Sequence, residues 1–291
     1  MGKKVSVLVL VVGCLTLRPD VRAGERPFVF NSIDFPGAIL TQASGINAGD
    51  EIVGFYRDTT GKNQGFVLTG GAFSTIDFPG AVANSAARGI VPAGDIVGTY
   101  QNPGEPPVII HGYLLTRGGQ FFRVDYPGHL NTIAQRIAPD GTILGCYHDA
   151  DQMGTMHGIV VAHEGPTEFA VPASMHTGST PNGKTIAGLY TTGGRTRGYL
   201  LDNGNFIPFD VPGSTFTQAW DINPAGDTVG VYRDAAGKVH GFMVENWTFT
   251  TIDFPGATAT NAFGINAGGD VVGSYVISGQ THGFLASRTQ R

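Results

Sequence analysis

The chain has 291 residues, a formal net charge of −5 at neutral pH and only 14% charged residues. A weakly acidic surface of this kind repels nucleic acid and anionic membranes, so nucleic-acid binding is excluded. The 44 glycines, together with the lack of a sustained 3.6-residue apolar period, favour short strands and tight turns over helices or disorder.

The N-terminal segment, residues 1–23, is predicted to be a signal peptide. Lys3 and Lys4 precede an apolar run over residues 5–17, and small or β-branched residues lead to a cleavage point after Ala23. The apolar run is too short to span a bilayer. A second interpretation stays open, in which Cys14 belongs to a lipoprotein cleavage box and becomes lipid-modified. We therefore expect a secreted or periplasmic protein, or one anchored through Cys14, with no membrane span.

Residues 24–291 are predicted to form a single domain of six repeats, each of about 43 residues. Each repeat has an aromatic strand that ends in a proline, which glycine follows in five of the six repeats, then a segment of small residues, then a Gly-x-Tyr segment. The prolines are Pro36, Pro79, Pro127, Pro172, Pro212 and Pro255. The Gly-x-Tyr segments begin at Gly54, Gly98, Gly145, Gly188, Gly230 and Gly273. This period, with four short strands in each repeat, predicts an all-β fold, a six-bladed β-propeller of four-stranded blades.

The connections within a repeat predict which strand is innermost. Residues 47–50, 58–61 and 69–72 carry the Asn, Asp and Gly residues of tight turns and are predicted to be hairpins. Residues 36–40 open with a proline and lack a tight-turn pattern, so this connection is predicted to cross to the next blade. The small-residue strand over 41–47 then becomes innermost, and the aromatic strand over 73–78 becomes outermost.

The first aromatic strand, residues 28–35, has no earlier strands of its own to join. We expect it to pair antiparallel with residues 282–286 and to close the ring. Unpaired outer strands at both ends of the chain would otherwise expose ladder groups and aromatic faces.

Residues that recur in nearly every repeat are expected to have structural roles. Gly54 and Tyr56 share one face of a strand, and a glycine beside a ring predicts close approach by a neighbouring aromatic side chain. A recurring acidic position holds Asp34, Asp77, Asp125, Asp210 and Asp253, and a recurring histidine position holds His111, His157, His240 and His282. Hydrogen bonds between strand ends are expected to explain both sets. The alternative is a ring of Asp or His around the central pore.

The His-Gly-aromatic segments give the repeat a family likeness. His111-Gly112-Tyr113, His240-Gly241-Phe242 and His282-Gly283-Phe284, with the Gly-Ile-Asn and Gly-Asp-x-Val-Gly segments, resemble the bacterial extracellular repeats of the HAF family. The resemblance spans residues 28–287. This chain has Gly at the middle position of the three-residue motif, where the family has Ala. The fourth repeat has Arg197 in place of the histidine. The resemblance implies export and a repeat fold, but no particular activity.

Departures from the repeat supply the candidate site residues, which are ligand-binding candidates, and no catalytic residue is assigned. His129, His148 and His176 lie outside the recurring histidine position. They are expected on one face of the disc, in crossing loops and in hairpins between third and fourth strands. Arg57 and Arg233 end two third strands, where each would bind a carboxylate or sulfate, or form a solvated pair with the Asp that follows.

The chain lacks the motifs of metal and cofactor sites. It has no close His or Cys pair at metal-ligand spacing, no P-loop, no dinucleotide-binding glycine pattern and no nucleophile elbow, so neither a metal nor a cofactor is expected. Cys146 is the one cysteine left after cleavage at Ala23, so it has no internal disulfide partner. It is expected to be a small buried side chain and not a reactive thiol.

Repetition without a chemical motif predicts an exported, non-enzymatic extracellular binding or scaffold module. The expected partners are carbohydrate, a cell-surface protein or a small molecule, and the protein is expected to be a monomer. The alternative is an extracellular polysaccharide hydrolase or lyase. Its site would lie on the disc face near repeats three and four, where non-repeated histidines could act as acid and base.

Overall fold

The computed structural model describes residues 27–80, 84–106, 109–149, 156–162 and 165–288. The predicted signal peptide, residues 1–23, and the alternative lipidation site Cys14 lie outside these ranges. The described residues form strands, turns and loops and no helix, so the fold is all-β. None of these residues forms an apolar helix long enough to cross a membrane.

The strands form six units that follow the sequence repeats. A repeat is counted from its aromatic strand, so the inner strand of each unit is a second strand, followed by the third and fourth strands and by the outer, aromatic strand. Unit 1 holds β2 (Leu40–Ile46), β3 (Ile52–Arg57), β4 (Asn63–Thr69) and β5 (Ala72–Ile76). Unit 2 holds β6 (Ser85–Ile90), β7 (Ile96–Tyr100), β8 (His111–Leu115) and β9 (Phe121–Val124). Unit 3 holds β10 (Asn131–Ile137), β11 (Ile143–His148), β12 (His157–Ala162) and β13 (Gly165–Pro172). Unit 4 holds β14 (Ser174–Ser179), β15 (Thr185–Thr192), β16 (Arg195–Asp202) and β17 (Asn205–Phe209). Unit 5 holds β18 (Phe216–Ile222), β19 (Thr228–Arg233), β20 (Val239–Glu245) and β21 (Thr248–Ile252). Unit 6 holds β22 (Ala259–Ile265), β23 (Val271–Ile277), β24 (Gln280–Arg288) and β1 (Phe28–Ile33).

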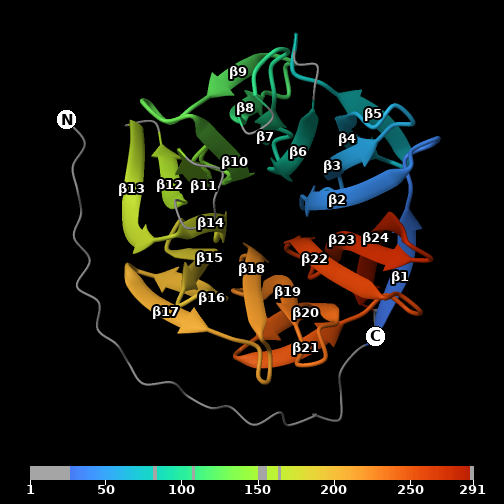
Figure 1. The fold of residues 1–291 in the computed structure, drawn as a ribbon, viewed down its shortest axis with the longest axis vertical. Helices are drawn as coiled ribbons and strands as arrows, with labels where there is room; N and C mark the ends of the chain where they lie inside the picture. Colours follow the sequence, from blue (N-terminus) through green and yellow to red (C-terminus); the bar gives the residue numbers. More distant parts are fainter. Residues whose placement is uncertain (1–26, 81–83, 107–108, 150–155, 163–164, 289–291) are drawn as a thin grey trace.

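The units are arranged around a common centre, with β2, β6, β10, β14, β18 and β22 nearest to it (Figure 1). Units 1 to 4 are separate four-stranded sheets. Units 5 and 6 differ from the expected separate sheets, because one parallel pair, Val239 with Ala259, joins them into an eight-stranded sheet. Asn63 and Asn84 form the equivalent bridge between units 1 and 2. A fourth strand thus begins beside the inner strand of the next unit.

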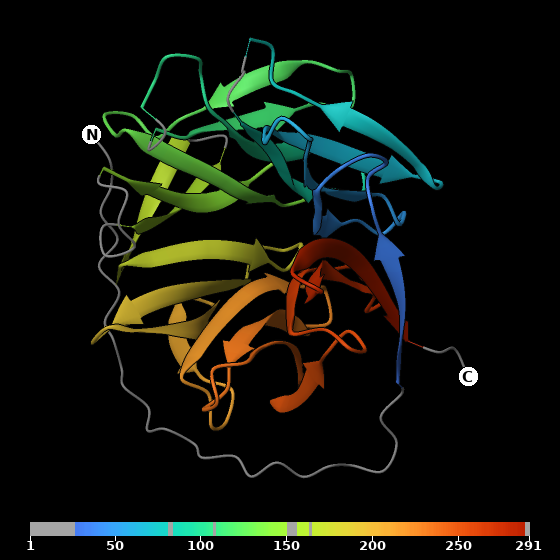
Figure 2. The same ribbon diagram turned by 45° about the vertical axis from the view of Figure 1, so that its right-hand side comes forward.

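The first strand pairs with the last one, as the repeat pattern predicts. β1 runs antiparallel to β24, with Phe28 opposite Arg288 and Ile33 opposite Gly283. The two strands lie side by side at opposite ends of the colour range in Figure 1 and in the turned view of Figure 2. The ring of Phe30 packs against Phe254 and Phe284, with centroids 5.4 and 5.7 Å away. Chain ends more than 250 residues apart are therefore joined by both a ladder and an aromatic contact.

The Pro-Gly connection between units begins with a tight turn, so the prediction that it lacks one is wrong. The amide of Ala38 donates to the carbonyl of Phe35 at 3.1 Å, and Gly37 has φ of +79°. Proline followed by a glycine with positive φ is the sequence of a type II turn. The chain turns first and then crosses to the next inner strand.

Each third strand has a glycine because the space of its side chain is occupied, by a carbonyl oxygen of the inner strand in all six units and also by a ring from the fourth strand in five of them. Gly54 lies opposite Phe66, and a Cβ on Gly54 would come within 2.9 Å of that ring. The same contact recurs at Gly98, Gly188, Gly230 and Gly273, against Tyr113, Tyr199, Phe242 and Phe284. These five rings are fully buried. The predicted aromatic approach is confirmed in these units; in unit 3 the residue opposite Gly145 is Ile159.

In four of the six units the tyrosine of the Gly-x-Tyr segment joins neighbouring units. Tyr56 stacks on Phe35 of the preceding Pro-Gly connection, with ring centroids 3.6 Å apart. Equivalent stacks pair Tyr100 with Phe78, Tyr147 with Tyr126 and Tyr275 with Phe254. Offset or stacked aromatic pairs of this kind contribute about 0.5–1.5 kcal/mol beyond burial.

The recurring histidines and acidic residues form hydrogen bonds at strand ends, as predicted. Nδ1 of His282 lies 2.7 Å from Asp34, and the corresponding pairs are His111 with Asp125 and His240 with Asp253. In unit 4 Arg197 replaces the histidine and binds Asp210. These pairs join fourth strands to outer strands, away from the centre, so the alternative of an Asp or His ring around the pore is wrong.

The centre of the ring is filled by an arginine and an aspartate. Four inner strands have glycine at one shared position, namely Gly45, Gly89, Gly178 and Gly264, whereas units 3 and 5 have Arg136 and Asp221 there. Arg136 donates to the carbonyls of Arg88, Ser44 and Phe263 and lies 3.3 Å from the Asp221 carboxylate. Both side chains are buried. One guanidinium thus contacts polar groups of four other units.

We expect Phe30→Ala to lower the free energy of unfolding by about 2–4 kcal/mol, because the substitution removes a ring from the Phe254 and Phe284 contacts. The matched control is Phe122→Ala, in outer strand β9, whose side chain is 50% exposed. The control is expected to cost less than about 1 kcal/mol. Urea unfolding followed by tryptophan fluorescence measures both. Equal losses for the two variants would contradict the docking of β1.

Arg136→Gly is expected to cost about 3–5 kcal/mol at neutral pH, because it leaves the buried Asp221 carboxylate without its cation. Burial already raises the pKa of Asp221. Protonation of Asp221 at lower pH should therefore reduce the cost. The double variant Arg136→Gly/Asp221→Gly restores the glycine of the other units, and its loss should be smaller than the sum of the single losses. Additive losses in denaturant unfolding would show that the two groups are not coupled.

Candidate functional site

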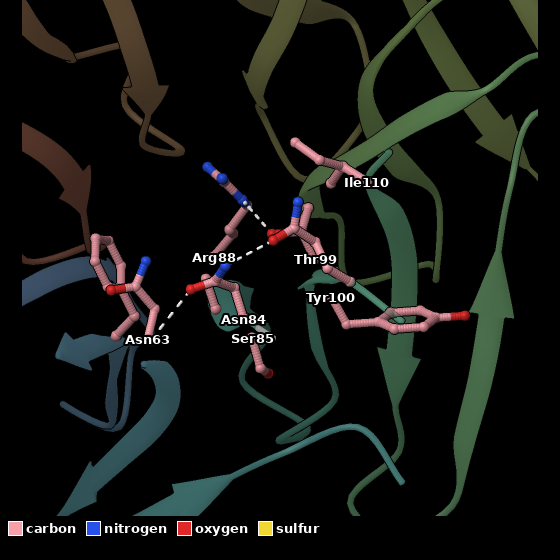
Figure 3. Close-up of a pocket in the computed structure, with 10 residues that line it drawn as sticks. Asn63, Asn84, Ser85, Arg88, Thr99, Tyr100 and Ile110 are labelled. Atoms are coloured by element: carbon pink, nitrogen blue, oxygen red, sulfur yellow. Dashed lines mark hydrogen bonds between the residues drawn. The ribbon is translucent and has the colours of Figure 1, made fainter. Parts of the chain in front are cut away.

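A pocket of about 200 Å³ lies between units 1 and 2. Its lining residues come from the third and fourth strands of unit 1 and the inner and third strands of unit 2. They are Phe55, Asn63, Asn84, Ser85, Ala86, Arg88, Thr99, Tyr100, Gln101 and Ile110. Figure 3 shows Arg88 hydrogen-bonded to Thr99 and Asn63 hydrogen-bonded to Asn84 beside this space, while the ring of Tyr100 points away from Arg88. Most of the lining residues are of polar type.

Carboxamide groups form one wall of the pocket. The backbone amide of Asn63 donates to Oδ1 of Asn84 at 3.3 Å, across the parallel bridge between the units. Nδ2 of Asn84 donates to Oε1 of Gln101 at 2.6 Å (Figure 3). Nε2 of Gln101 donates to the carbonyl of Ile109 at 3.3 Å. This chain of hydrogen bonds orients amide groups that both donate and accept.

Arg88 forms the inner end of the pocket. Its Nε donates to Thr99 Oγ1 and its Nη1 to Gln135 Oε1, each at 3.1 Å. In the described part of the chain, no carboxylate lies within ion-pairing distance of this guanidinium. Burial and the neighbouring positive charge of Arg136 lower the pKa of Arg88. The pocket therefore holds a cation whose protein partners are all neutral.

The pocket exists because Ala86 is the smallest residue at its position in the repeat. The other inner strands have Gln42, Ile133, Met175, Gln218 and Asn261 at this position. Between units 3 and 4 the equivalent space is filled by the buried cluster of Cys146, Met156, Met175 and Leu189. A methyl group in place of a long side chain leaves the space between units 1 and 2 open.

The lining favours hydrogen bonding over acid–base chemistry. None of the ten lining residues is a carboxylate, a histidine or a cysteine. No group of three or more potential metal ligands occurs among the residues that the structure describes. Amides, hydroxyls and one guanidinium bind a polar ligand in a fixed orientation, but general acid or base catalysis needs a group that titrates near the working pH.

A second, shallower hollow of about 120 Å³ lies at the other end of the inner strands. Residues from all six inner-strand turns line it, among them Ile46, Pro92, Pro181 and Pro224. Arg136 and Asp221 belong to the same lining, so the ion pair at the centre closes this hollow from below.

The structure places the histidine candidates in different surroundings. His129 lies in the crossing loop before β10, where its Nδ1 is 2.9 Å from Asp149 and its ring is 4.0 Å from that of Tyr147. His148 ends β11 opposite Asn131 and is only 8% exposed.

The prediction that His176 lies in an exposed crossing loop is wrong. His176 belongs to inner strand β14 and is fully buried, with Nδ1 2.6 Å from the hydroxyl of Tyr199. Alanine occupies this position in every other unit, as Ala43, Ala87, Ala134, Ala219 and Ala262. Burial lowers the pKa of His176 to about 3, so the ring is neutral in the folded protein at neutral pH.

Of the two arginine candidates, Arg57 lies next to the pocket and Arg233 does not. Nε of Arg57 donates to Oδ1 of Asn63 at 2.9 Å, so Arg57 supports the amide wall from outside the lining. Arg233 lies 5.4 Å above the ring of Phe216, the residue opposite it in the ladder of unit 5. Cys146 is fully buried and burial raises the pKa of its thiol to about 12, which agrees with the expected inert cysteine.

Sequence reasoning missed Asn63, Asn84, Arg88 and Gln101. The position after each repeated tyrosine holds Arg57, Gln101, His148, Thr191, Arg233 and Val276, and Arg88 stands where other units have Ser44, Gln135, Thr177, Trp220 and Phe263. This variability points to Gln101 and Arg88 as well as to the predicted candidates Arg57, His148 and Arg233. Ala86 carried no signal, because a small residue in an inner strand looks like the rest of the repeat.

No protein-family model and no curated protein matches the chain. Solved structures do share its fold. The β-propeller domain of the Trilobed protease from Pyrococcus furiosus aligns with a TM-score of 0.53 at 10% identity, over 87% of this chain and 95% of that one. The lectin AAL from Aleuria aurantia, solved in complex with Fucα1-6GlcNAc, aligns with a TM-score of 0.53 at 11% identity, over 85% and 92%. A gluconolactonase from Xanthomonas campestris aligns with a TM-score of 0.52 at 13% identity, over 95% and 100%. The chain therefore has the fold of β-propellers.

We expect His176 to make the stability of the protein fall in mild acid. Its folded-state pKa of about 3 lies below the ordinary value of 6.5, so the unfolded chain binds the proton first as the pH falls. The stabilisation is complete above pH 6.5 and is lost towards pH 3, at about 1.4 kcal/mol per pH unit. In His176→Gln this contribution should disappear. Denaturant unfolding at several pH values measures this. If the free energy of unfolding falls equally steeply between pH 7 and pH 4 in the wild type and in His176→Gln, the assignment is contradicted.

Proposed function

We propose that this protein is an exported, six-bladed β-propeller that binds small carbohydrates without transforming them, at the pocket between units 1 and 2. In this proposal the six units are the six blades and β1 closes the ring. The observation that carries the function is the lining of the pocket, which offers oriented amides, hydroxyls and a guanidinium but no carboxylate or histidine.

The pocket suits a ligand with several hydroxyl groups. Side-chain amides donate and accept at once, as sugar hydroxyls do. Those of Asn84 and Gln101 are held by a hydrogen bond to each other, and that of Asn63 accepts from Arg57. Phe55 and Ile110 supply apolar surface beside them. The volume of about 200 Å³ lies below the roughly 300–1,000 Å³ of pockets for drug-sized molecules, so we infer a single sugar ring.

The comparisons support binding and enzymatic modules alike, because the AAL lectin and the gluconolactonase have the same fold at low identity. The lining has no carboxylate, histidine or cysteine, which supports binding over acid–base catalysis. The enzyme alternative near units 3 and 4 loses support because His176, one of its three histidines, is enclosed in the core.

The location follows from the sequence. The proposed signal peptide, residues 1–23, and the resemblance to HAF-family repeats both favour a secreted or periplasmic protein, and Cys14 keeps lipid anchoring as the alternative. A protein outside the cytoplasm meets free sugars and cell-surface glycans, which fits the proposed ligand class.

The test uses Ala86→Met, which places at the pocket the residue that unit 4 has at the same position, Met175. Ligand-observed NMR against a panel of monosaccharides should show millimolar or tighter binding to the wild type and its loss in Ala86→Met. Asn261→Met is the matched control between units 5 and 6 and should leave binding unchanged. Lack of binding to any sugar of the panel, or equal binding by Ala86→Met, would overturn the proposed function.

A further inference from the structure

Several arginines of the described residues pair with a carboxylate, whereas Arg88 does not. Arg136 pairs with Asp221 at 3.3 Å, Arg197 with Asp210 at 2.5 Å, and Arg288 with Glu245. In the described residues Arg88 has only Thr99 and Gln135 as hydrogen-bond partners, both neutral. A cation removed from water without an anion is costly, and this cost falls when a ligand supplies the negative charge.

A second arginine next to the pocket has a similar environment. Arg57 donates to Asn63, and no ion pair with a carboxylate is found for it within the described ranges. The carboxylate of the adjacent Asp58 accepts hydrogen bonds from Thr60, Lys62 and Gln64 instead. Two guanidinium groups therefore place positive charge around this pocket in a chain whose net charge is −5.

We propose that the ligand of this pocket carries a carboxylate, as a hexuronic acid does, and that Arg88 binds this group. The inference rests on the proposed function, which it deepens by naming the ligand class. The guanidinium N–H groups that Thr99 and Gln135 do not use are the donors for the carboxylate, since planar guanidinium and carboxylate groups match in geometry. The amides of Asn63, Asn84 and Gln101 bind the ring hydroxyls.

Acidic and neutral sugars of the same ring geometry test the inference. Isothermal titration at low ionic strength, with galacturonate against galactose and glucuronate against glucose, should give at least about tenfold tighter binding of the acidic member. Added salt should weaken this preference, because it screens the charge of a half-buried site. Equal affinity for the acidic and neutral members would overturn the inference while leaving the proposed function standing. Binding of neither would overturn both.

Variants assign the preference to Arg88. Arg88→Gln should remove most of the preference for the acidic sugar over the neutral one, whereas Arg88→Lys should keep part of this preference. The control is Arg117→Gln, which changes the charge equally in the β8–β9 turn, where Arg117 donates to the carbonyl of Ala93. An unchanged preference in Arg88→Gln would overturn the assignment. If Arg88→Gln does not fold, as judged by circular dichroism, Arg88→Lys and the wild-type sugar pairs still decide.

Acetate separates a sugar site from a site for any small carboxylate. Acetate offers the charge without the ring, so it should bind at least about tenfold more weakly than galacturonate. Equal affinity for acetate and galacturonate would overturn the inference, since the hydroxyl groups would then contribute nothing.

Discussion

The packing of a fourth-strand ring onto a third-strand glycine is the contact on which the rest of this structure depends. At Gly188 a Cβ would come within 2.2 Å of the Tyr199 ring, so any other residue there would displace a fully buried aromatic side chain. The contact sets the spacing of the two strands and directs the ring into the space between units. The tyrosine two residues later then stacks on the Pro-Gly connection of the unit before, as Tyr56 does on Phe35.

Residues can vary for function only at positions that contribute little to this repeated packing. The inner-strand position of Ala86 and the position after each repeated tyrosine contribute little to this packing, so their residues differ from unit to unit. Between units 3 and 4 apolar side chains fill the available space, whereas Ala86 leaves it open between units 1 and 2. A binding site in a repeat protein of this kind is a local departure from the repeat, held rigid by the units on either side.

Much of the architecture could be predicted from the repeat, and much less of the site. The inner and outer strands and the pairing of Phe28–Ile33 with the last strand follow from where the turn residues lie. The Pro-Gly turn was missed because a proline was interpreted only as a residue that cannot join a ladder, although Gly37 after it permits a type II turn. The sequence analysis places His176 in an exposed loop, whereas its Nδ1 lies 2.6 Å from the Tyr199 hydroxyl inside the core.

The sequence by itself determined the all-β class, the repeat, the phase of the strands and the structural role of the recurring Gly, Tyr, His and Asp residues. Each of these depends on local chemistry that returns at a constant spacing, so one repeat explains the others. Only the tertiary structure decided that Arg136 reaches Asp221 across the centre and that Arg88 lies in an open pocket without a carboxylate. Those outcomes depend on side chains from different units meeting in space, and on the volume that their neighbours leave unfilled, neither of which has a spacing along the chain.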